Sequence, residues 1–416
     1  MPETKTPLQT VAVVGAGYVG LPLCLQLAKA GLKVTAVDVD EGVVRAINNR
    51  VAKVEENEDF ERFFADPEVQ ANLDARTTPL EADAFVIAVP TPLGKDGESP
   101  DLKAVTAAAE SIVPFVRPGN LVVVESTIPP LTTETVVKPI LAKSGFQVGE
   151  EILLAHCPER IMPGNLMNEV VFNARVIGGI TEPSTKRAAE LFGRFVQGKL
   201  IFTEARTAEF VKLIENAYRD VNIAFANQIA MLCERLGIDA GEAIALANHH
   251  PRVDILKPGI GVGGHCIPVD PWFLVDTCPD LTDLLRTARH LNNAMPQRTA
   301  QQIIKAIEGI DGIDGIDDPK VVCLGATYKP NVRDTRESPA LEVFRILQEK
   351  GFNASLFDPL LKEYFCDSVL SAARGCDALV ILVPHDLIVT EIQYRKQEIL
   401  AAMRRPNLLS FTPGVL

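Results

Sequence analysis

The sequence predicts an α/β protein with two doubly wound parallel-sheet domains, joined by a long central helix and a helical dimerisation region. Three observations lead to this prediction. Apolar strands alternate with helices near the N-terminus, a shorter copy of that pattern returns near the C-terminus, and one long helical pattern lies between them. The 416 residues exceed a single core of ordinary size, so two or three domains are expected.

The N-terminal region has the pattern of a parallel sheet. Residues 10–14 form an apolar strand, residues 19–30 a helix ended by Gly31, and residues 33–37 a second strand that leads to Asp38. Further buried strands are expected at 84–89, 121–124 and 152–155.

A glycine-rich turn connects the first strand to the first helix. Gly15, Gly17 and Gly20 have the spacing Gly-x-Gly-x-x-Gly, and Asp38 follows eighteen residues after Gly20. In this context the pattern predicts a dinucleotide-binding Rossmann domain, because such glycines let backbone N–H groups approach a pyrophosphate. A carboxylate at position 38 can accept hydrogen bonds from the adenosine ribose and would repel a 2′-phosphate. The sequence therefore predicts NAD as the cofactor, and FAD suits the remaining motifs less well.

The C-terminal region repeats the N-terminal one. Residues 377–384 match residues 83–90 at six of eight positions. The strand expected at 320–324 and the later Asp358 correspond to the first strand and Asp38. Matches in the same order predict a second Rossmann-like domain.

The turn that follows residues 320–324 keeps only the first of the three glycines, Gly325. A bare helix N-terminus is therefore less suited to hold a phosphate there. We expect Lys329 and Arg336 to supply the positive charge that a nucleotide needs in this domain.

Between the two repeats, residues 207–236 have apolar positions at helical spacing and are followed by Gly237, which is typical of a helix C-cap. A helix of this length spans ~45 Å, enough to bridge two domains and to offer a dimer surface. The predicted domains are 1–205, 206–308 and 319–416, and the Asp-, Gly- and Ile-rich run 309–319 is predicted to be a linker.

Composition excludes several classes of function. The net charge of −13 argues against nucleic acid or an anionic membrane surface as the main partner. No apolar stretch approaches the ~20 residues of a membrane span, and no signal peptide precedes the first strand, so a cytoplasmic location is expected. The eight cysteines show no Cys-x-x-Cys pair and the six histidines no i,i+4 pair, which predicts free thiols and no metal.

Cys266 is the strongest candidate for a catalytic residue. It lies in the glycine- and proline-rich run 263–272, four residues before Asp270. Free cysteines are often buried as small hydrophobic residues, but such a loop gives no packing reason for a thiol. A thiol together with a nicotinamide can oxidise an aldehyde to an acid. His265 is not expected to act as the base for its neighbour, because adjacent side chains usually diverge.

Polar residues on the central helix form a second candidate. Lys212 and Asn216 are four residues apart and share a helix face, and Arg219 lies three residues further on. An ammonium and an amide on one face could stabilise an oxyanion. In isolation, a solvated polar face would be the preferred interpretation. The pairs Ser126-Thr127 and Glu159-Arg160 follow strands, where they could contact a ligand or equally serve as helix caps or surface pairs.

Taken together, these motifs resemble one known family through essentially the whole chain. The motifs are Gly-Tyr-Val-Gly-Leu-Pro at 17–22, Pro-Thr-Pro at 90–92, Cys-Pro-Glu-Arg at 157–160, Glu-Asn-x-x-Arg-Asp-Val-Asn-Ile-Ala-Phe-Ala-Asn at 215–227, the Cys266 loop, Lys-Pro-Asn at 329–331 and Arg-Glu-Ser-Pro at 336–339. They look like the UDP-sugar 6-dehydrogenases, the UDP-glucose/GDP-mannose dehydrogenase family. His-Pro-Arg-Val at 250–253 and Gly-Gly-His-Cys at 263–266 look most like its UDP-N-acetylmannosamine branch.

The resemblance implies a four-electron oxidation of a sugar C6 hydroxyl by two NAD⁺, through a thiohemiacetal and a thioester on Cys266. Lys212 and Asn216 would stabilise the oxyanion, Asp270 would activate water or tune the thiol, and Glu159 or Thr127 would position the water. The implied NAD contacts are Gly15, Gly17, Tyr18, Val19, Gly20, Asp38, Thr91, Thr127 and Arg336. The implied sugar-nucleotide contacts are Arg160, Ile161, Lys212, Asn216, Arg219, His250, Arg252, Gly263, Tyr328 and Lys329.

The resemblance also implies a substrate and a partner. The implied reaction converts UDP-N-acetyl-D-mannosamine to UDP-N-acetyl-D-mannosaminuronate for polysaccharide biosynthesis, with UDP-N-acetyl-D-glucosamine and UDP-glucose as alternative substrates. A homodimer, or a tetramer built from it, is implied, with Arg252 reaching the partner's site and the C-terminal domain binding UDP. Arg333 departs from the family pattern, which often has an acidic residue there.

Two other functions remain to be distinguished from this one. A simple NAD-dependent 2-hydroxy-acid or 6-phosphogluconate-type dehydrogenase would need no thiol and would consume one NAD⁺ per turnover. A non-enzymatic regulator that binds NAD or a sugar nucleotide would have no use for Cys266, Lys212 and Asn216 together.

Overall fold

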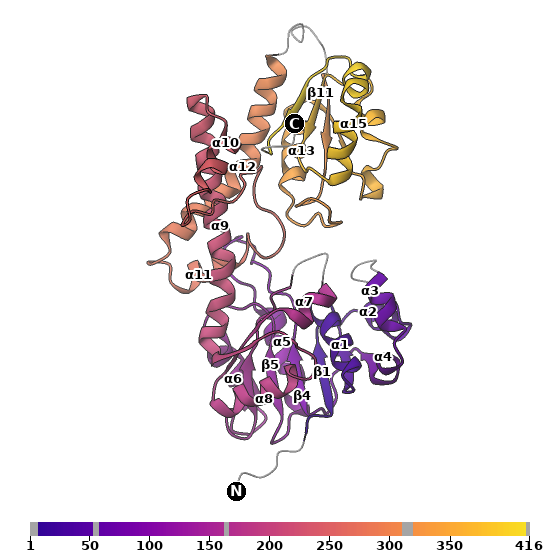
Figure 1. Cartoon of the computed structure of the whole chain (residues 1–416). Helices are drawn as coiled ribbons and strands as arrows, with labels where there is room; N and C mark the ends of the chain where they lie inside the picture. The colour runs from indigo at the N-terminus through magenta and orange to yellow at the C-terminus, as the bar shows by residue number, and fades with distance from the viewer. Residues whose placement is uncertain (1–6, 53–57, 162–165, 310–318, 413–416) are drawn as a thin grey trace. The chain divides into compact units, whose positions relative to one another are not determined.

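The computed structural model describes residues 7–52, 58–161, 166–309 and 319–412 (Figure 1). Its contacts divide the chain into two compact units. The first consists of residues 1–215 and 276–278, and the second of residues 216–275 and 279–416. Nearly all of the predicted linker 309–319 lies outside the described residues.

The first unit is built around an eight-stranded sheet of strand order β3-β2-β1-β4-β5-β6-β7-β8. Neighbouring strands are parallel except β6 and β7. The strands are β1 (Thr10–Val14), β2 (Lys33–Val37), β3 (Leu73–Arg76), β4 (Ala84–Ile87), β5 (Leu121–Val124), β6 (Leu153–His156), β7 (Arg175–Gly179) and β8 (Leu200–Glu204). This parallel-dominated sheet confirms the predicted α/β class.

Helices cover both faces of this sheet, as the alternation of buried residues requires. Val13 belongs to an apolar core shared with α1, whereas its neighbour Val14 belongs to a second core shared with α5. Every residue of β4 and β5 is buried, as expected for central strands of a doubly wound sheet. The helical segments are α1 (Gly20–Lys29), α2 (Glu41–Asn48), α3 (Glu58–Phe64), α4 (Pro67–Asn72), α5 (Lys103–Ile112), η1 (Val113–Phe115), η2 (Thr133–Val137), α6 (Lys138–Ala142), α7 (Leu166–Phe172) and α8 (Glu182–Phe192).

A 32-residue helix, α9 (Ala205–Leu236), confirms the predicted long central helix (Figure 1). Gly237 follows it with a φ of 68°, the left-handed conformation of a C-cap glycine. The residues up to Glu215 belong to the first unit, and the rest belong to the second. The other helices of this region are α10 (Ala240–Ala247), α11 (Asp270–Thr277) and α12 (Asp283–Glu308).

A buried polar cluster joins α9 to α12 within the second unit. Arg289 donates to the Asp220 carboxylate at 2.5 Å, and Asn292 Nδ2 donates to the same oxygen at 2.8 Å. All three side chains are at most 1% exposed, so their polar groups depend on one another for hydrogen bonding.

The second unit contains a parallel four-stranded sheet of order β10-β9-β11-β12. Its strands are β9 (Lys320–Leu324), β10 (Asn353–Phe357), β11 (Ala378–Ile381) and β12 (Leu408–Ser410). Its helical segments are α13 (Pro339–Glu349), η3 (Lys362–Tyr364), α14 (Val369–Ala373) and α15 (Asp386–Ala402). Two separate apolar cores pack against the sheet. This is the second Rossmann-like domain predicted from the repeat.

The two sheets share a hydrogen-bonding device at the turn after their first strand. In the first sheet, Asp38 accepts the N–H of Ala16 at 3.0 Å. In the second, Asp358 accepts the N–H of Ala326 at 2.7 Å. Asp358 is fully buried, and a second fully buried residue, His385, places Nε2 3.0 Å from the same carboxylate oxygen.

Among the described residues, no helix combines the length and the apolar character needed to cross a bilayer.

Candidate active site

The glycine-rich turn between β1 and α1 has the geometry of a phosphate-binding turn. A Cβ on Gly20 would lie 1.8 Å from the carbonyl oxygen of Gly15, so only glycine fits there. Tyr18 and Val19, which stand between them, are half-buried. Helix α1 begins at Gly20, and its first backbone N–H groups form an electropositive end, which is the kind of site that can bind a pyrophosphate.

Asp38 lies beside this turn at the end of β2. One carboxylate oxygen accepts the N–H of Ala16 at 3.0 Å, and the other accepts the N–H of Asp40 at 2.9 Å. A carboxylate has about four acceptor sites, so these two bonds leave capacity for two ribose hydroxyls. Together with the glycine-rich turn, this carboxylate gives the first unit the groups that NAD requires.

Two of the predicted NAD contacts meet at the carboxyl ends of β4 and β5. Thr91 Oγ1 donates to the carbonyl oxygen of Thr127 at 2.6 Å, and Ser126 Oγ donates to that of Val89 at 2.7 Å. The carboxyl edge of a doubly wound sheet is where ligands bind. Arg336, also predicted to contact NAD, belongs to the second unit.

The Cys-Pro-Glu-Arg motif lies just after β6. Glu159 is buried, and its carboxylate accepts the N–H of Ile161 at 2.7 Å. The Arg160 guanidinium pairs with Glu215 of α9 and donates to the carbonyl of Ala174 at 3.0 Å. An arginine held by two partners within the first unit presents its charge in a fixed direction.

Beneath this motif is a buried ion pair that the sequence interpretation missed. Arg175 donates to Glu125 at 2.7 Å, and both side chains are almost fully buried. Burial raises the pKa of Glu125 to about 7, against the lowering effect of Arg175 and with a further rise from the charge of Glu159. The only signal in the sequence was a charged residue, Arg175, at the start of the otherwise apolar run 175–179. Its partner, Glu125, is fifty residues away, so no local pattern predicts the pair.

The Cys266 loop is held by backbone contacts. The Cys266 carbonyl accepts the N–H groups of Val269 and Asp270 at 3.0 and 2.9 Å, which forms the turn that opens α11. A Cβ on Gly263 would lie 2.4 Å from the carbonyl oxygen of Glu337, so this glycine allows the loop to approach the 328–337 segment. The thiol of Cys266 is half-buried.

Asn216 and Asp270, both predicted to be catalytic, meet directly. Asn216 Nδ2 donates to Asp270 Oδ2 at 2.6 Å, and both side chains are buried. Lys212 lies one turn before Asn216 on α9 and is half-buried. The structure therefore brings Asn216 and Asp270 together, and Lys212 lies on the same helix as Asn216.

The expectation that His265 would point away from Cys266 is wrong. His265 Nδ1 lies 2.9 Å from Cys266 Sγ. The loop after Gly264 does not follow a helix or strand, so the usual divergence of adjacent side chains does not apply to it.

Tyr328, Asp334 and Arg336 stand on the other side of the loop. Arg336 forks onto Asp334, with Nε at 3.0 Å and Nη2 at 2.6 Å from its two carboxylate oxygens. Burial raises the pKa of Tyr328 to about 12, helped by the charges of Asp334 and Cys266 and opposed by those of Arg336 and Arg219. Tyr328 is therefore a neutral hydrogen-bonding group at physiological pH. Lys329 follows it and is half-buried.

Three predicted substrate contacts lie on exposed parts of the second unit: Arg219, His250 and Arg252. His250 Nδ1 accepts the N–H of Arg252 at 3.3 Å. The side chains of Arg219 and Arg252 are therefore accessible to a ligand or another chain.

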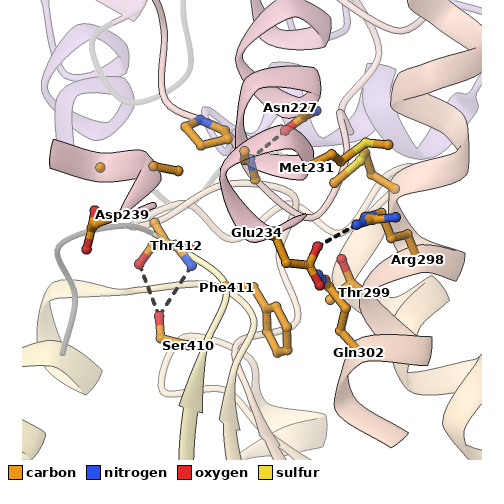
Figure 2. A pocket seen from close by; sticks show the side chains of 16 residues that line it. Asn227, Met231, Glu234, Asp239, Arg298, Thr299, Gln302, Ser410, Phe411 and Thr412 are labelled. Atoms are coloured by element: carbon orange, nitrogen blue, oxygen red, sulfur yellow. Dashed lines mark hydrogen bonds and ion pairs between the residues drawn. The ribbon is translucent and has the colours of Figure 1, made fainter. Parts of the chain in front are cut away.

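A pocket of about 250 Å³ lies elsewhere in the second unit, between α9, α10, α12 and the end of β12 (Figure 2). Figure 2 shows Glu234 and Arg298 paired at its wall, with Phe411 facing them. None of the predicted site residues is among the residues that line it. Among the described residues, no cluster of His, Cys, Asp and Glu side chains could hold a metal ion.

Three family models match the chain in succession. They are the NAD binding domain at residues 9–196, the central domain at 206–294 and the UDP binding domain at 322–409, all of the UDP-glucose/GDP-mannose dehydrogenase family.

Named relatives and solved structures agree with these matches. The UDP-N-acetyl-D-mannosamine dehydrogenase of Methanocaldococcus jannaschii is 45% identical over 90% of this chain and 86% of its own length. The NDP-N-acetyl-D-galactosaminuronic acid dehydrogenase of Ralstonia nicotianae is 41% identical over 93% and 91%. The solved UDP-D-ManNAc dehydrogenase from Pyrococcus horikoshii superposes with a TM-score of 0.90 at 36% identity, covering 98% of this chain and 96% of that one.

Proposed function

The chain belongs to the UDP-glucose/GDP-mannose dehydrogenase family, and we propose that it oxidises UDP-N-acetyl-D-mannosamine to UDP-N-acetyl-D-mannosaminuronate with two NAD⁺. The observation that carries this proposal is the Cys266 loop. Its half-buried thiol lies four residues before Asp270, which is hydrogen-bonded to the buried Asn216. A thiol is needed for the second oxidation, because an aldehyde must first be captured before it can lose another hydride.

The first unit provides the cofactor site. The glycine-rich turn at Gly15–Gly20 holds the pyrophosphate, Asp38 the adenosine ribose, and Thr91 and Thr127 line the carboxyl edge of the sheet. NAD⁺ held by these residues would supply the hydride acceptor for the sugar C6. Because a carboxylate at Asp38 repels a 2′-phosphate, NADP⁺ is a poor substitute.

The protein's own groups then act in sequence. Cys266 forms a C–S bond to the aldehyde carbon, and the resulting thiohemiacetal is oxidised to a thioester. Lys212 and Asn216 stabilise the negative oxygen of these intermediates, since an ammonium and an amide offer it hydrogen bonds. Glu159 and Thr127 position the water that releases the acid, and Asp270 assists its deprotonation.

The sugar nucleotide is held by cations and by the C-terminal sheet domain. Arg160, Ile161 and Arg219 contact the sugar nucleotide together with Gly263, and Tyr328 and Lys329 bind its UDP moiety. The neutral Tyr328 suits this role, because a phenolate would repel a diphosphate.

The sugar itself is assigned from named relatives. Relatives called UDP-N-acetyl-D-mannosamine dehydrogenase are 42–45% identical to this chain over most of its length. An N-acetylated sugar also suits His250 and Arg252, which offer hydrogen-bond donors to the acetamido carbonyl.

A substrate panel tests this assignment. Purified protein is supplied with NAD⁺ and, separately, UDP-N-acetylmannosamine, UDP-N-acetylglucosamine, UDP-N-acetylgalactosamine and UDP-glucose, and NADH release is measured. The first should give the highest kcat/KM, with two NADH per acid. A higher kcat/KM for another sugar would reject the sugar assignment, and one NADH per turnover would reject the thioester route.

We further propose a homodimer whose interface includes α9. A stripe of side chains along this helix is between 41% and 69% exposed, although its members are large and apolar: Phe210, Ile214, Tyr218, Phe225, Leu232 and Leu236. Their spacing of four or seven residues keeps them on one helix face. A contiguous apolar stripe of this length favours a protein partner, and a second copy of α9 fits it by symmetry.

In such a dimer we expect Arg252 to serve the partner's active site. The test is complementation between Cys266→Ala and Arg252→Ala subunits, each nearly inactive alone. Random exchange gives mixed dimers with one intact site, so about a quarter of the wild-type rate should return. No recovery in verified mixed dimers would place Arg252 in its own subunit's site. We also propose a cytoplasmic location, because the eight cysteines show no Cys-x-x-Cys pair and no spacing of a disulfide framework, as is typical of proteins in a reducing compartment.

A further inference from the structure

His265 is fixed beside Cys266 by backbone contacts on both sides. Before it, the N–H of Gly264 donates to the carbonyl of Arg336 at 3.0 Å. After it, the Cys266 carbonyl accepts two N–H groups from the turn into α11. With the backbone held at both ends, His265 Nδ1 comes within 2.9 Å of Cys266 Sγ. The contact therefore depends on the turn into α11 and on the backbone of Arg336.

The two atoms lie within hydrogen-bonding distance of each other. A thiol is a weak donor and the neutral imidazole nitrogen an acceptor, so the pair is arranged for transfer of the thiol proton. Such a pairing of a thiol with an adjacent base is the usual means of activating a cysteine nucleophile.

The surrounding charges favour the product of that transfer. Burial raises the pKa of Asp334, but its hydrogen bonds to Arg336, with the charges of Arg336 and His265, lower it below its ordinary value. Asp334 is therefore an anion, and its charge would stabilise a proton taken up by His265. The pKa of Arg336 is raised, chiefly by its hydrogen bond to Asp334 and to a smaller extent by a negative charge on Cys266. Tyr328 stays neutral, and Asp270 is engaged with Asn216.

We propose that His265 is a further catalytic residue, the general base that takes the proton from Cys266 as its sulfur attacks the sugar aldehyde. The inference rests on the proposed function and adds a residue to it. It also separates two roles: His265 acts on the thiol, whereas Asp270 acts on water.

The step balances in atoms and electrons. The S–H proton moves to Nδ1, the sulfur lone pair forms the C–S bond, and the carbonyl π pair moves to oxygen, which takes up the proton. When water later cleaves the thioester, the C–S bond breaks and its electron pair stays on sulfur. The proton lost by the attacking water returns to sulfur through His265, which regenerates the thiol.

The test measures the reactivity of one thiol in the full-length protein, without any sugar. Iodoacetamide is added at pH 5 to 10, and peptide mapping gives the alkylation rates of Cys266 and of Cys278, an exposed cysteine that serves as the internal reference. His265→Asn should slow alkylation of Cys266 at pH 7 by about tenfold and move its pH profile upward, because the thiolate fraction falls. Cys278 should be unaffected.

His265→Gln provides a second comparison, and His249→Gln, at an exposed histidine, is the matched control. An unchanged Cys266 profile in either folded His265 variant would overturn the proposal. With substrate, His265→Asn should lower kcat about 100-fold at unchanged KM for the sugar nucleotide. Should no UDP-sugar be oxidised by the wild type, the proposed function would fail, while the alkylation comparison would still decide the role of His265.

Discussion

Asn216 Nδ2 donates to Asp270 Oδ2 at 2.6 Å, which ties the middle of α9 to the first residue of α11. Both side chains are buried, and Asp270 follows Cys266 by one turn. The amide thus fixes the direction of a carboxylate close to the nucleophile. A carboxylate held in this way can accept a proton without first losing a water shell.

Replacing Asp270 by Asn should therefore reduce kcat by about 100-fold or more with little change in KM, because the shape of the pair is kept and its charge is lost. Steady-state NADH release gives both constants. Asp254→Asn is the control, since Asp254 is an exposed carboxylate on the same chain segment. Equal losses in both variants would mean that Asp270 has no specific role.

Cys266→Ala should abolish formation of the acid while NAD⁺ and the UDP-sugar still bind, because the second oxidation requires the thioester. Product analysis by mass spectrometry and calorimetric binding measure the two effects. Cys278→Ala, at an exposed cysteine, should behave as the wild type. Full production of the acid by Cys266→Ala would rule out covalent catalysis.

Asp38 should determine cofactor choice. Asp38→Asn keeps an acceptor for the N–H of Ala16 and removes the charge that repels a 2′-phosphate. The ratio of kcat/KM for NAD⁺ to that for NADP⁺ should therefore fall by about tenfold, while the wild type strongly prefers NAD⁺. Glu41→Gln, an exposed neighbour, should leave the ratio unchanged. A wild-type enzyme that uses both cofactors equally would contradict this role.

His156 should make folding sensitive to acid. Burial lowers the pKa of His156 to about 3, against a smaller opposing effect of Val124. Below the ordinary histidine pKa of 6.5, His156 binds a proton in the unfolded chain but not in the folded chain. The free energy of unfolding therefore falls as the pH drops from 6.5 toward 3.

The slope from this residue is at most about 1.4 kcal/mol per pH unit. Urea unfolding of wild type and His156→Phe across this range isolates it, because the carboxylates contribute equally to both. The variant should show the flatter profile. Parallel profiles would indicate that His156 is protonated in the folded protein.

Much of this structure was predictable because it depends on local patterns. The bounds of β1, β2 and β9 agree with the predicted strands, since each is a short apolar run that begins with a polar residue and is followed by a glycine or an aspartate. Helix α9 begins at Ala205, two residues earlier than predicted.

Contacts between distant segments were less predictable. The antiparallel pairing of β7 with β6 and the Arg175–Glu125 pair depend on how the chain returns to the sheet, which no local pattern records. The error over His265 has the same cause. Its orientation follows from a turn anchored to Arg336, more than sixty residues away in the sequence.

The buried Asp358–His385 contact makes two copies of one fold chemically unequal. His385 Nδ1 accepts the N–H of Asn331 at 2.9 Å, so its proton is on Nε2, facing Asp358. The carboxylate that corresponds to Asp38 is thereby satisfied inside the protein and has no free edge for a ribose. NAD⁺ should consequently be excluded from the C-terminal domain even at high concentration. The buried Asp358–His385 contact would therefore confine NAD⁺ to the N-terminal sheet domain and leave the C-terminal domain to the UDP-sugar.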